Sequence, residues 1–106
     1  MTREERLAAN ENAFRRVNER VEDLASDDED RLDFVCECSD IACTERVRLS
    51  VAAYEDVRAA PNRFVVRSGH ERPEVERVID QGIGYVVVEK LGQAGEAAVE
   101  DDPRST

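Results

Sequence analysis

The first pattern along the chain is a helical one near the N-terminus. Through residues 3–25, apolar side chains recur at a spacing of seven that is interleaved by threes and fours, which is the periodicity of a helix with one narrow apolar stripe. Thr2 followed by Glu5 has the form of a capping box, so an amphipathic helix is predicted within residues 1–26. The apolar stripe consists of Leu7, Asn10, Phe14, Val17, Val21 and Leu24.

Two interpretations of this stripe are open at the level of sequence. The helix can lie on its own domain, or it can pair with a protein partner or a second copy of the chain. In a paired arrangement, the amide of Asn10 would weaken a coiled coil but define its register. The stripe is therefore a candidate interaction surface.

Shorter periodic segments follow. The predicted elements are strands at 47–49 and 63–67, a helix at 51–60, and a hairpin of strands at 74–80 and 85–91 around a turn at 81–84. Ser50 is placed to cap the helix. A short helix over residues 74–81 is the alternative for the first hairpin strand. Glu74, Glu76 and Asp80 alternate with apolar residues and are predicted to line the solvated side of that strand.

Charge divides the chain into segments. Residues 22–33 hold seven acidic residues and one basic residue, and residues 92–106 hold four acidic residues and one basic residue. Segments with high charge and few apolar residues bury too little surface to fold alone. An acidic linker is therefore predicted at residues 27–33 and a disordered acidic tail at residues 92–106. Between them, residues 34–91 form the predicted domain.

Length and charge limit the classes of function. With 106 residues and a formal net charge of -10, the chain forms one small acidic domain. Nucleic acid requires a basic surface, and the one basic cluster is Arg15, Arg16 and Arg20 on the first helix, so nucleic acid is not an expected partner. No apolar run approaches the roughly 18 residues that span a bilayer. These features predict a cytoplasmic protein without a membrane partner.

The candidate chemistry lies in the cysteines. Their arrangement is Cys36-x-Cys38-x4-Cys43, and the single histidine, His70, follows a glycine turn 27 positions later. Three thiolates and one imidazole form a ligand set that zinc commonly binds in a closed tetrahedron. Asp40 predicts a turn between the second and third cysteines, and a strand carrying the first two would direct both thiols to one face. A structural zinc site of these four residues is predicted.

Three other interpretations of the cysteine segment are open. The cysteines can be buried and inert beside a surface His70, they can form a thiol redox element, or one of them can act as a nucleophile with His70 as its base. A reducing cytosol disfavours structural disulfides, and an odd number of cysteines leaves one unpaired. A fully ligated zinc has no open position for water, so the zinc interpretation predicts a protein that is not an enzyme.

The segment FVCECSDIACTERVRLSVAAYEDVRAAPNRFVVRSGHE, residues 34–71, resembles a group of small, functionally uncharacterised actinobacterial proteins. The shared features are an N-terminal helix of the NExxFRxVNER type, a Cys-Glu-Cys segment with a third cysteine before Thr-Glu-Arg, and a Gly-His pair after a short strand. The likeness extends over about residues 8–90. It implies the grouping of Cys36, Cys38, Cys43 and His70, and it brings no activity, substrate or partner with it.

These observations predict an α+β fold: a long N-terminal helix and a small antiparallel sheet, with a zinc-tied loop region and one short helix. The predicted function is a zinc-stabilised adaptor or regulatory module that acts through protein–protein contacts. A redox-responsive zinc–thiolate switch and a small cysteine-dependent enzyme are the alternatives.

Overall fold

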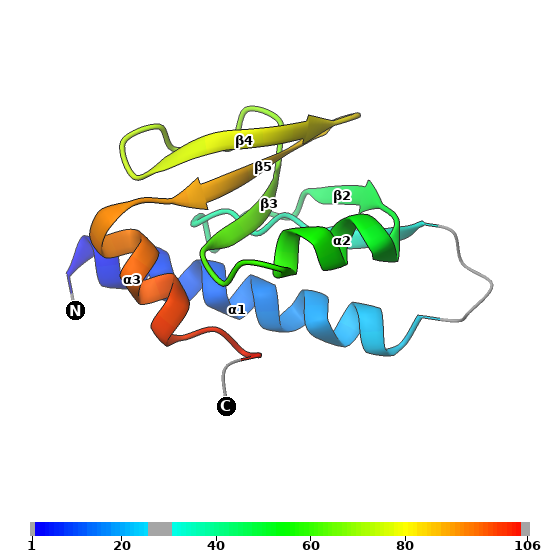
Figure 1. Ribbon diagram of the computed structural model, residues 1–106, viewed down its shortest axis with the longest axis horizontal. Helices are drawn as coiled ribbons and strands as arrows, with labels where there is room; N and C mark the ends of the chain where they lie inside the picture. The colour runs from blue at the N-terminus through cyan, green and yellow to red at the C-terminus, as the bar shows by residue number, and fades with distance from the viewer. Residues whose placement is uncertain (1, 26–30, 105–106) are drawn as a thin grey trace.

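The computed structural model describes residues 2–25 and 31–104 (Figure 1). Its elements are α1 (Arg3–Asp23), β1 (Leu32–Val35), β2 (Arg46–Leu49), α2 (Val51–Arg58), β3 (Arg63–Arg67), β4 (Glu76–Gly82), β5 (Tyr85–Lys90) and α3 (Gly92–Glu100). An antiparallel pair, β1–β2, accompanies an antiparallel three-stranded sheet in the order β3-β5-β4. The predicted α+β class is confirmed. Residues 27–30 of the predicted acidic linker lie outside the described residues.

Both longer predicted helices begin where their capping residues indicated. The Thr2 hydroxyl accepts a hydrogen bond from the Glu5 N–H at 3.1 Å, and the Ser50 hydroxyl accepts one from the Ala53 N–H at 3.0 Å. These bonds satisfy amide groups that have no partner within the first turn of a helix. Local side-chain chemistry therefore defines where α1 and α2 start.

The predicted hairpin is also confirmed, and the alternative of a helix over residues 74–81 is wrong. Gly82 pairs with Tyr85, which leaves Ile83 and Gly84 as a two-residue turn. Gly84 has a φ of 81°, a left-handed conformation that glycine adopts without steric cost. The β-branched run that follows prefers the extended chain and forms β5.

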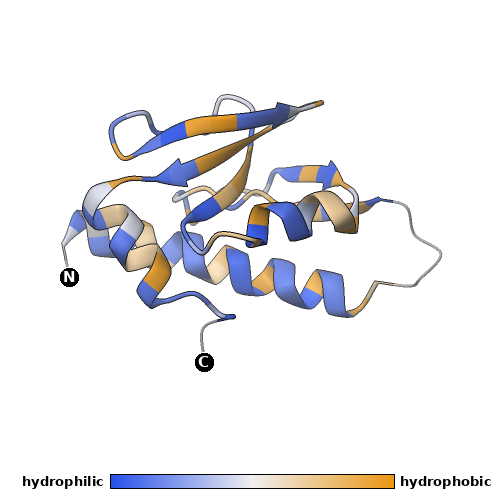
Figure 2. Cartoon of the chain, viewed as in Figure 1, coloured by the Kyte–Doolittle hydropathy of each residue, from blue (hydrophilic) through white to orange (hydrophobic). Residues whose placement is uncertain are grey.

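Strands β3 and β5 of the three-stranded sheet are buried on both faces, whereas β4 is exposed beyond Glu76. Val65 and Val87 face one core cluster, which also contains residues of β1, β2 and α2. The alternate positions of the same strands face a second cluster with Ala98 of α3 and two cysteines. Because side chains alternate along a strand, a run of consecutive valines supplies both faces (Figure 2). The members of the second cluster are Cys36, Cys38, Phe64, Val66, Val86, Val88 and Ala98.

Helix α1 lies on its own domain through a mostly polar side, and the predicted apolar stripe is divided, because Val21 packs against the first core cluster whereas other members are exposed. Its buried residues are Ala8, Glu11, Asn12, Arg15 and Asn18. Within the stripe, Val17 and Leu24 are 46% and 69% exposed, and the Asn10 amide donates to the Ser39 carbonyl at 2.8 Å. Buried polar groups are tolerated where they are hydrogen-bonded. None of the helices in the described ranges is long and apolar enough to cross a membrane.

The prediction of disorder over residues 92–106 is wrong for its first part, because Gly92–Glu100 forms α3. This helix packs against α1 and β5. The Arg15 guanidinium, on α1, donates to the Ala98 carbonyl at 2.8 Å. Arg15 lies near the other end of the chain, so the composition of residues 92–106 did not reveal this partner.

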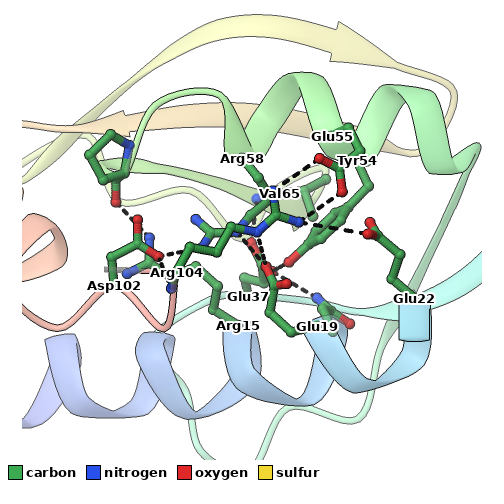
Figure 3. Close-up of polar contacts among 12 residues, drawn as sticks. Arg15, Glu19, Glu22, Glu37, Tyr54, Glu55, Arg58, Val65, Asp102 and Arg104 are labelled. Atoms are coloured by element: carbon green, nitrogen blue, oxygen red, sulfur yellow. Dashed lines mark hydrogen bonds and ion pairs between the residues drawn. The ribbon is translucent and has the colours of Figure 1, made fainter. Parts of the chain in front are cut away.

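Two arginines hold the segment that follows α3 (Figure 3). Arg58, on α2, pairs with Asp102 and with Glu19 of α1. Arg104 donates to Glu19 at 2.8 Å and to Glu55 at 2.8 and 3.0 Å. Paired hydrogen bonds between a guanidinium and a carboxylate fix geometry as well as charge, so residues 102–104 are attached to both α1 and α2.

A second buried ionic group lies between α1 and the sheet. Lys90 forms ion pairs with both Glu11 and Glu76, and the side chains of all three are at most 6% exposed. The prediction that Glu76 lies on a solvated side is therefore wrong. Its reason is tertiary: α1 covers this end of β4 and β5 and excludes water. The carboxylates of Glu11 and Glu76 share the one ammonium group of Lys90, which leaves a surplus negative charge at a site that is buried from water.

This surplus predicts a pH dependence. Burial raises the pKa of Glu11 to about 7, although Lys90 acts to lower it. Between its ordinary pKa and that value the folded protein binds more protons than the unfolded chain, so stability rises as pH falls from about 7 towards 4.5. Glu11→Gln has no titrating group at position 11. Relative to this variant, the wild type should gain up to about 3 kcal/mol in free energy of unfolding as the pH is lowered from 8 to 4.5.

Urea unfolding of both proteins across this pH range measures the difference. Glu5→Gln is the matched control, because Glu5 is exposed on the same helix and its removal should leave the wild-type profile in place. Parallel pH profiles for wild type and Glu11→Gln would contradict the assignment of this proton to Glu11.

Candidate metal centre

Cys36 and Cys38 follow directly after β1, so they lie beyond the strand rather than within it. The extended path nevertheless continues, because the Cys36 N–H donates to the Glu45 carbonyl at 3.1 Å and the Glu37 N–H donates to the Val65 carbonyl at 2.9 Å. Both cysteines are buried in the second core cluster, and they are 1% and 5% exposed. The alternation predicted for a strand therefore still directs the two thiols to one side.

The other two predicted ligands come from separate turns. The Asp40 carboxylate accepts from the Ala42 N–H at 2.9 Å, and the Asp40 carbonyl accepts from the Cys43 N–H at 3.0 Å, so the predicted turn around Asp40 is confirmed. His70 lies in the turn after β3, where its N–H donates to the Arg67 carbonyl at 2.9 Å. Both turns bring half-buried side chains to the two buried thiols.

All four predicted ligands meet. The Nδ1 atom of His70 lies 3.6 Å from the Sγ atoms of both Cys36 and Cys43. Zn–S bonds of about 2.3 Å and a Zn–N bond of about 2.1 Å in a tetrahedron place sulfur and nitrogen about 3.6 Å apart. The four ligand atoms, including Sγ of Cys38, lie within 4.8 Å of one another. Their spacing and chemistry fit a metal ion.

The electrostatics of the cluster also suit a cation. The pKa of Cys38 falls to about 5 because the Cys36 thiol donates a hydrogen bond to the Cys38 thiolate. That same bond, together with burial, raises the pKa of Cys36. The Arg67 N–H donates to the Cys36 sulfur at 3.2 Å, a contact that favours thiolate charge. Burial also raises the pKa of Cys43, so the deprotonation of all three thiols at this spacing would need a positive ion among them.

A polar depression of about 410 Å³ opens beside Cys38 and His70. Its other lining residues include Asp40, Glu71 and Arg72. The centre is therefore reached from solvent on this side, while the opposite side is closed by the core. Acidic groups at the rim raise the local concentration of cations.

Glu37 is the residue of this region that sequence reasoning missed. It lies between Cys36 and Cys38, is fully buried, and points to the other side of the chain. Its carboxylate accepts hydrogen bonds from Asn18 Nδ2, the Tyr54 hydroxyl and the Val65 N–H at 2.9, 2.7 and 3.0 Å. Burial raises its pKa. The sequence offered one signal for Glu37, because side chains alternate along an extended chain and this alternation places Glu37 on the side opposite the two cysteines. The burial of Glu37 depended on α1 and α2, which the local sequence does not show.

The chain matches no protein-family model, no curated protein and no solved structure. Of the features shared with the actinobacterial group, the structure shows that Cys36, Cys38, Cys43 and His70 lie together. Membership of the actinobacterial group stays a prediction. The residues of the site therefore carry the functional conclusion.

Proposed function

We propose that this protein is a zinc-binding module in which Cys36, Cys38, Cys43 and His70 hold one structural Zn²⁺. The observation that supports it is the equal distance of 3.6 Å from Nδ1 of His70 to two cysteine sulfurs, which is the edge of a zinc tetrahedron. Soft thiolates with imidazole favour zinc over hard cations such as magnesium. Four protein ligands leave no position for water, so the ion ties two turns to the core.

Metal analysis tests this proposal. Protein prepared with added zinc and freed of loosely bound metal should contain one zinc per chain, and Cys36→Ser should contain almost none, because a hydroxyl is a poor zinc ligand. Glu74→Gln is the matched control: Glu74 is exposed beside the centre but is outside the ligand set, so this variant should keep its zinc. Zinc well below one per chain in the wild type, or full zinc in Cys36→Ser, would contradict the proposal.

The proposed manner of action is protein–protein contact through the exposed side of α1. Val17 and Leu24, one heptad apart on the apolar stripe, remain exposed after the helix has packed on its own domain. Charged substitutions at both positions should abolish self-association or capture of a partner and leave zinc bound. If the wild type and the charged variant both sediment with the mass of a monomer, the result would count against pairing with a second copy.

A redox-responsive switch is the second candidate, and the exposure of Cys43 favours it. This ligand is half-buried on an irregular loop, whereas Cys36 and Cys38 are enclosed. In the switch, two thiolates lose two electrons to form a disulfide, a peroxide is reduced to two hydroxides, and zinc leaves. Zinc release at low peroxide that a reductant reverses supports the switch; zinc retained until the protein unfolds rules it out.

A further inference from the structure

The Glu37 side chain and backbone together hold one residue of β3. Its N–H donates to the Val65 carbonyl at 2.9 Å, and its Oε1 atom accepts from the Val65 N–H at 3.0 Å. A buried main-chain amide and carbonyl both need partners, and Glu37 supplies both. The chain between the two buried cysteines is thereby attached to the sheet at a defined position.

Asn18 of α1 holds Val35, the residue before Cys36, in the same way. Its Nδ2 atom donates to the Val35 carbonyl at 2.9 Å, and its Oδ1 atom accepts from the Val35 N–H at 2.7 Å. The Asn18 amide also donates to Oε2 of Glu37 at 2.9 Å. The same oxygen accepts from the Tyr54 hydroxyl at 2.7 Å (Figure 3). Both residues that flank Cys36 are thus held by paired hydrogen bonds.

Packing alone does not account for a carboxylate at position 37. The site is enclosed by the sheet and by α1 and α2, and a buried ionic group is commonly no more stable than an apolar side chain of similar volume. What the carboxylate adds is direction, because hydrogen bonds determine the orientation of the groups they join. Its three donors come from α1, α2 and β3, which are far apart in the sequence.

We propose that Glu37, held by Asn18, is a positioning residue that sets the directions of Cys36 and Cys38 for metal binding. The inference rests on the proposed zinc site. In an extended chain, fixing the backbone on either side of a residue fixes its Cα–Cβ direction. Thiols that are already aligned lose less freedom when the ion binds. Partners in this outer position typically contribute about 10–100-fold to metal affinity.

Glu37→Gln tests the proposal. Glutamine has one acceptor oxygen where the carboxylate has two, so it loses either the bond from the Val65 N–H or the bonds from Asn18 and Tyr54. The Zn²⁺ affinity of the folded protein, measured by competition with a chromophoric chelator, should fall about 10–100-fold. The absorption bands of the Co²⁺-loaded variant should shift, because the geometry of its thiolate ligands has changed.

Two further variants separate positioning from general stability. Val57→Ala truncates the other core cluster, away from the cysteines, so it should lower the free energy of unfolding but keep wild-type zinc affinity and Co²⁺ bands while folded. Asn18→Ala releases Val35 and one bond to Glu37, and it should weaken zinc binding in the same direction as Glu37→Gln. If Glu37→Gln fails to fold, Asn18→Ala provides the measurement.

The outcomes distinguish this inference from the proposed function. If Glu37→Gln binds zinc as tightly as the wild type does, the positioning role is overturned and the zinc site stands. The same holds for Asn18→Ala where only that variant folds. Equal losses of affinity in Val57→Ala and Glu37→Gln would also overturn it, since the effect would then be one of stability. A wild type that binds no zinc refutes the proposed function itself.

Discussion

Arg15→Ala is expected to lower the free energy of unfolding by about 3–5 kcal/mol, the range for truncating a large buried side chain to alanine. The Arg15 side chain is fully buried. It donates to the Pro61 carbonyl at 2.6 Å, to the Ala98 carbonyl at 2.8 Å and to Asn12 Oδ1 at 2.8 Å. Alanine leaves these acceptors without a donor and opens a cavity above the ring of Phe64, which lies 4.4 Å from the guanidinium carbon.

Arg16→Ala is the matched control, because Arg16 is the next residue of the same helix and is exposed. Its loss should change the free energy of unfolding by less than about 0.5 kcal/mol. Chemical denaturation followed by circular dichroism measures both variants. Faster hydrogen exchange in α3 of Arg15→Ala should accompany the loss, since this helix is held through Ala98. A difference below about 1 kcal/mol between the two variants would contradict the buried role of Arg15.

Removing the proposed zinc ion is expected to have an effect of similar size. An ion that binds only the folded protein stabilises it by about 4 kcal/mol when its free concentration is 1,000 times its dissociation constant. The gain should be large here because the ligands close a loop of 34 residues between Cys36 and His70. Denaturation midpoints measured in excess zinc and in excess chelator should therefore differ clearly.

Cys36→Ser is the control for this measurement. It should unfold at the same denaturant concentration in zinc and in chelator, close to the midpoint of the metal-free wild type. Cys36 also packs in the second core cluster, and serine retains most of its volume, so the control separates loss of the ion from loss of the side chain. A wild-type midpoint that does not respond to zinc would contradict a structural role for the metal.

Patterns with a local cause were predictable. Ser50 marked the start of α2, Gly84 marked the hairpin turn, and the valine runs marked β3 and β5, because each depends on neighbouring residues alone. The candidate ligand set was also predictable. Zinc chemistry depends on the identities of the four side chains, and the chain contains three cysteines and one histidine. The structure then showed these residues together.

The polar side of α1 and the helix α3 were not predictable in this way. Apolar periodicity reports where apolar side chains gather, and it assigned α1 a stripe of which Val17 and Leu24 stay exposed. A buried arginine, asparagine or glutamate leaves no such trace, because its burial is tolerated only when a particular partner is present. The partner of Arg15 at Ala98 is 83 positions away.

The sequence alone therefore determined most of the local elements, though not β1 or α3. It also determined the class of fold and the set of candidate metal ligands, since these follow from short-range preferences and from side-chain chemistry. Only the tertiary structure decided which side of α1 is buried and how Glu37 is held. It also decided whether His70, 34 positions from Cys36, reaches the thiols. The physical reason is that hydrogen bonds and ligand geometry act over about 3 Å, and only the folded chain brings distant residues within that range.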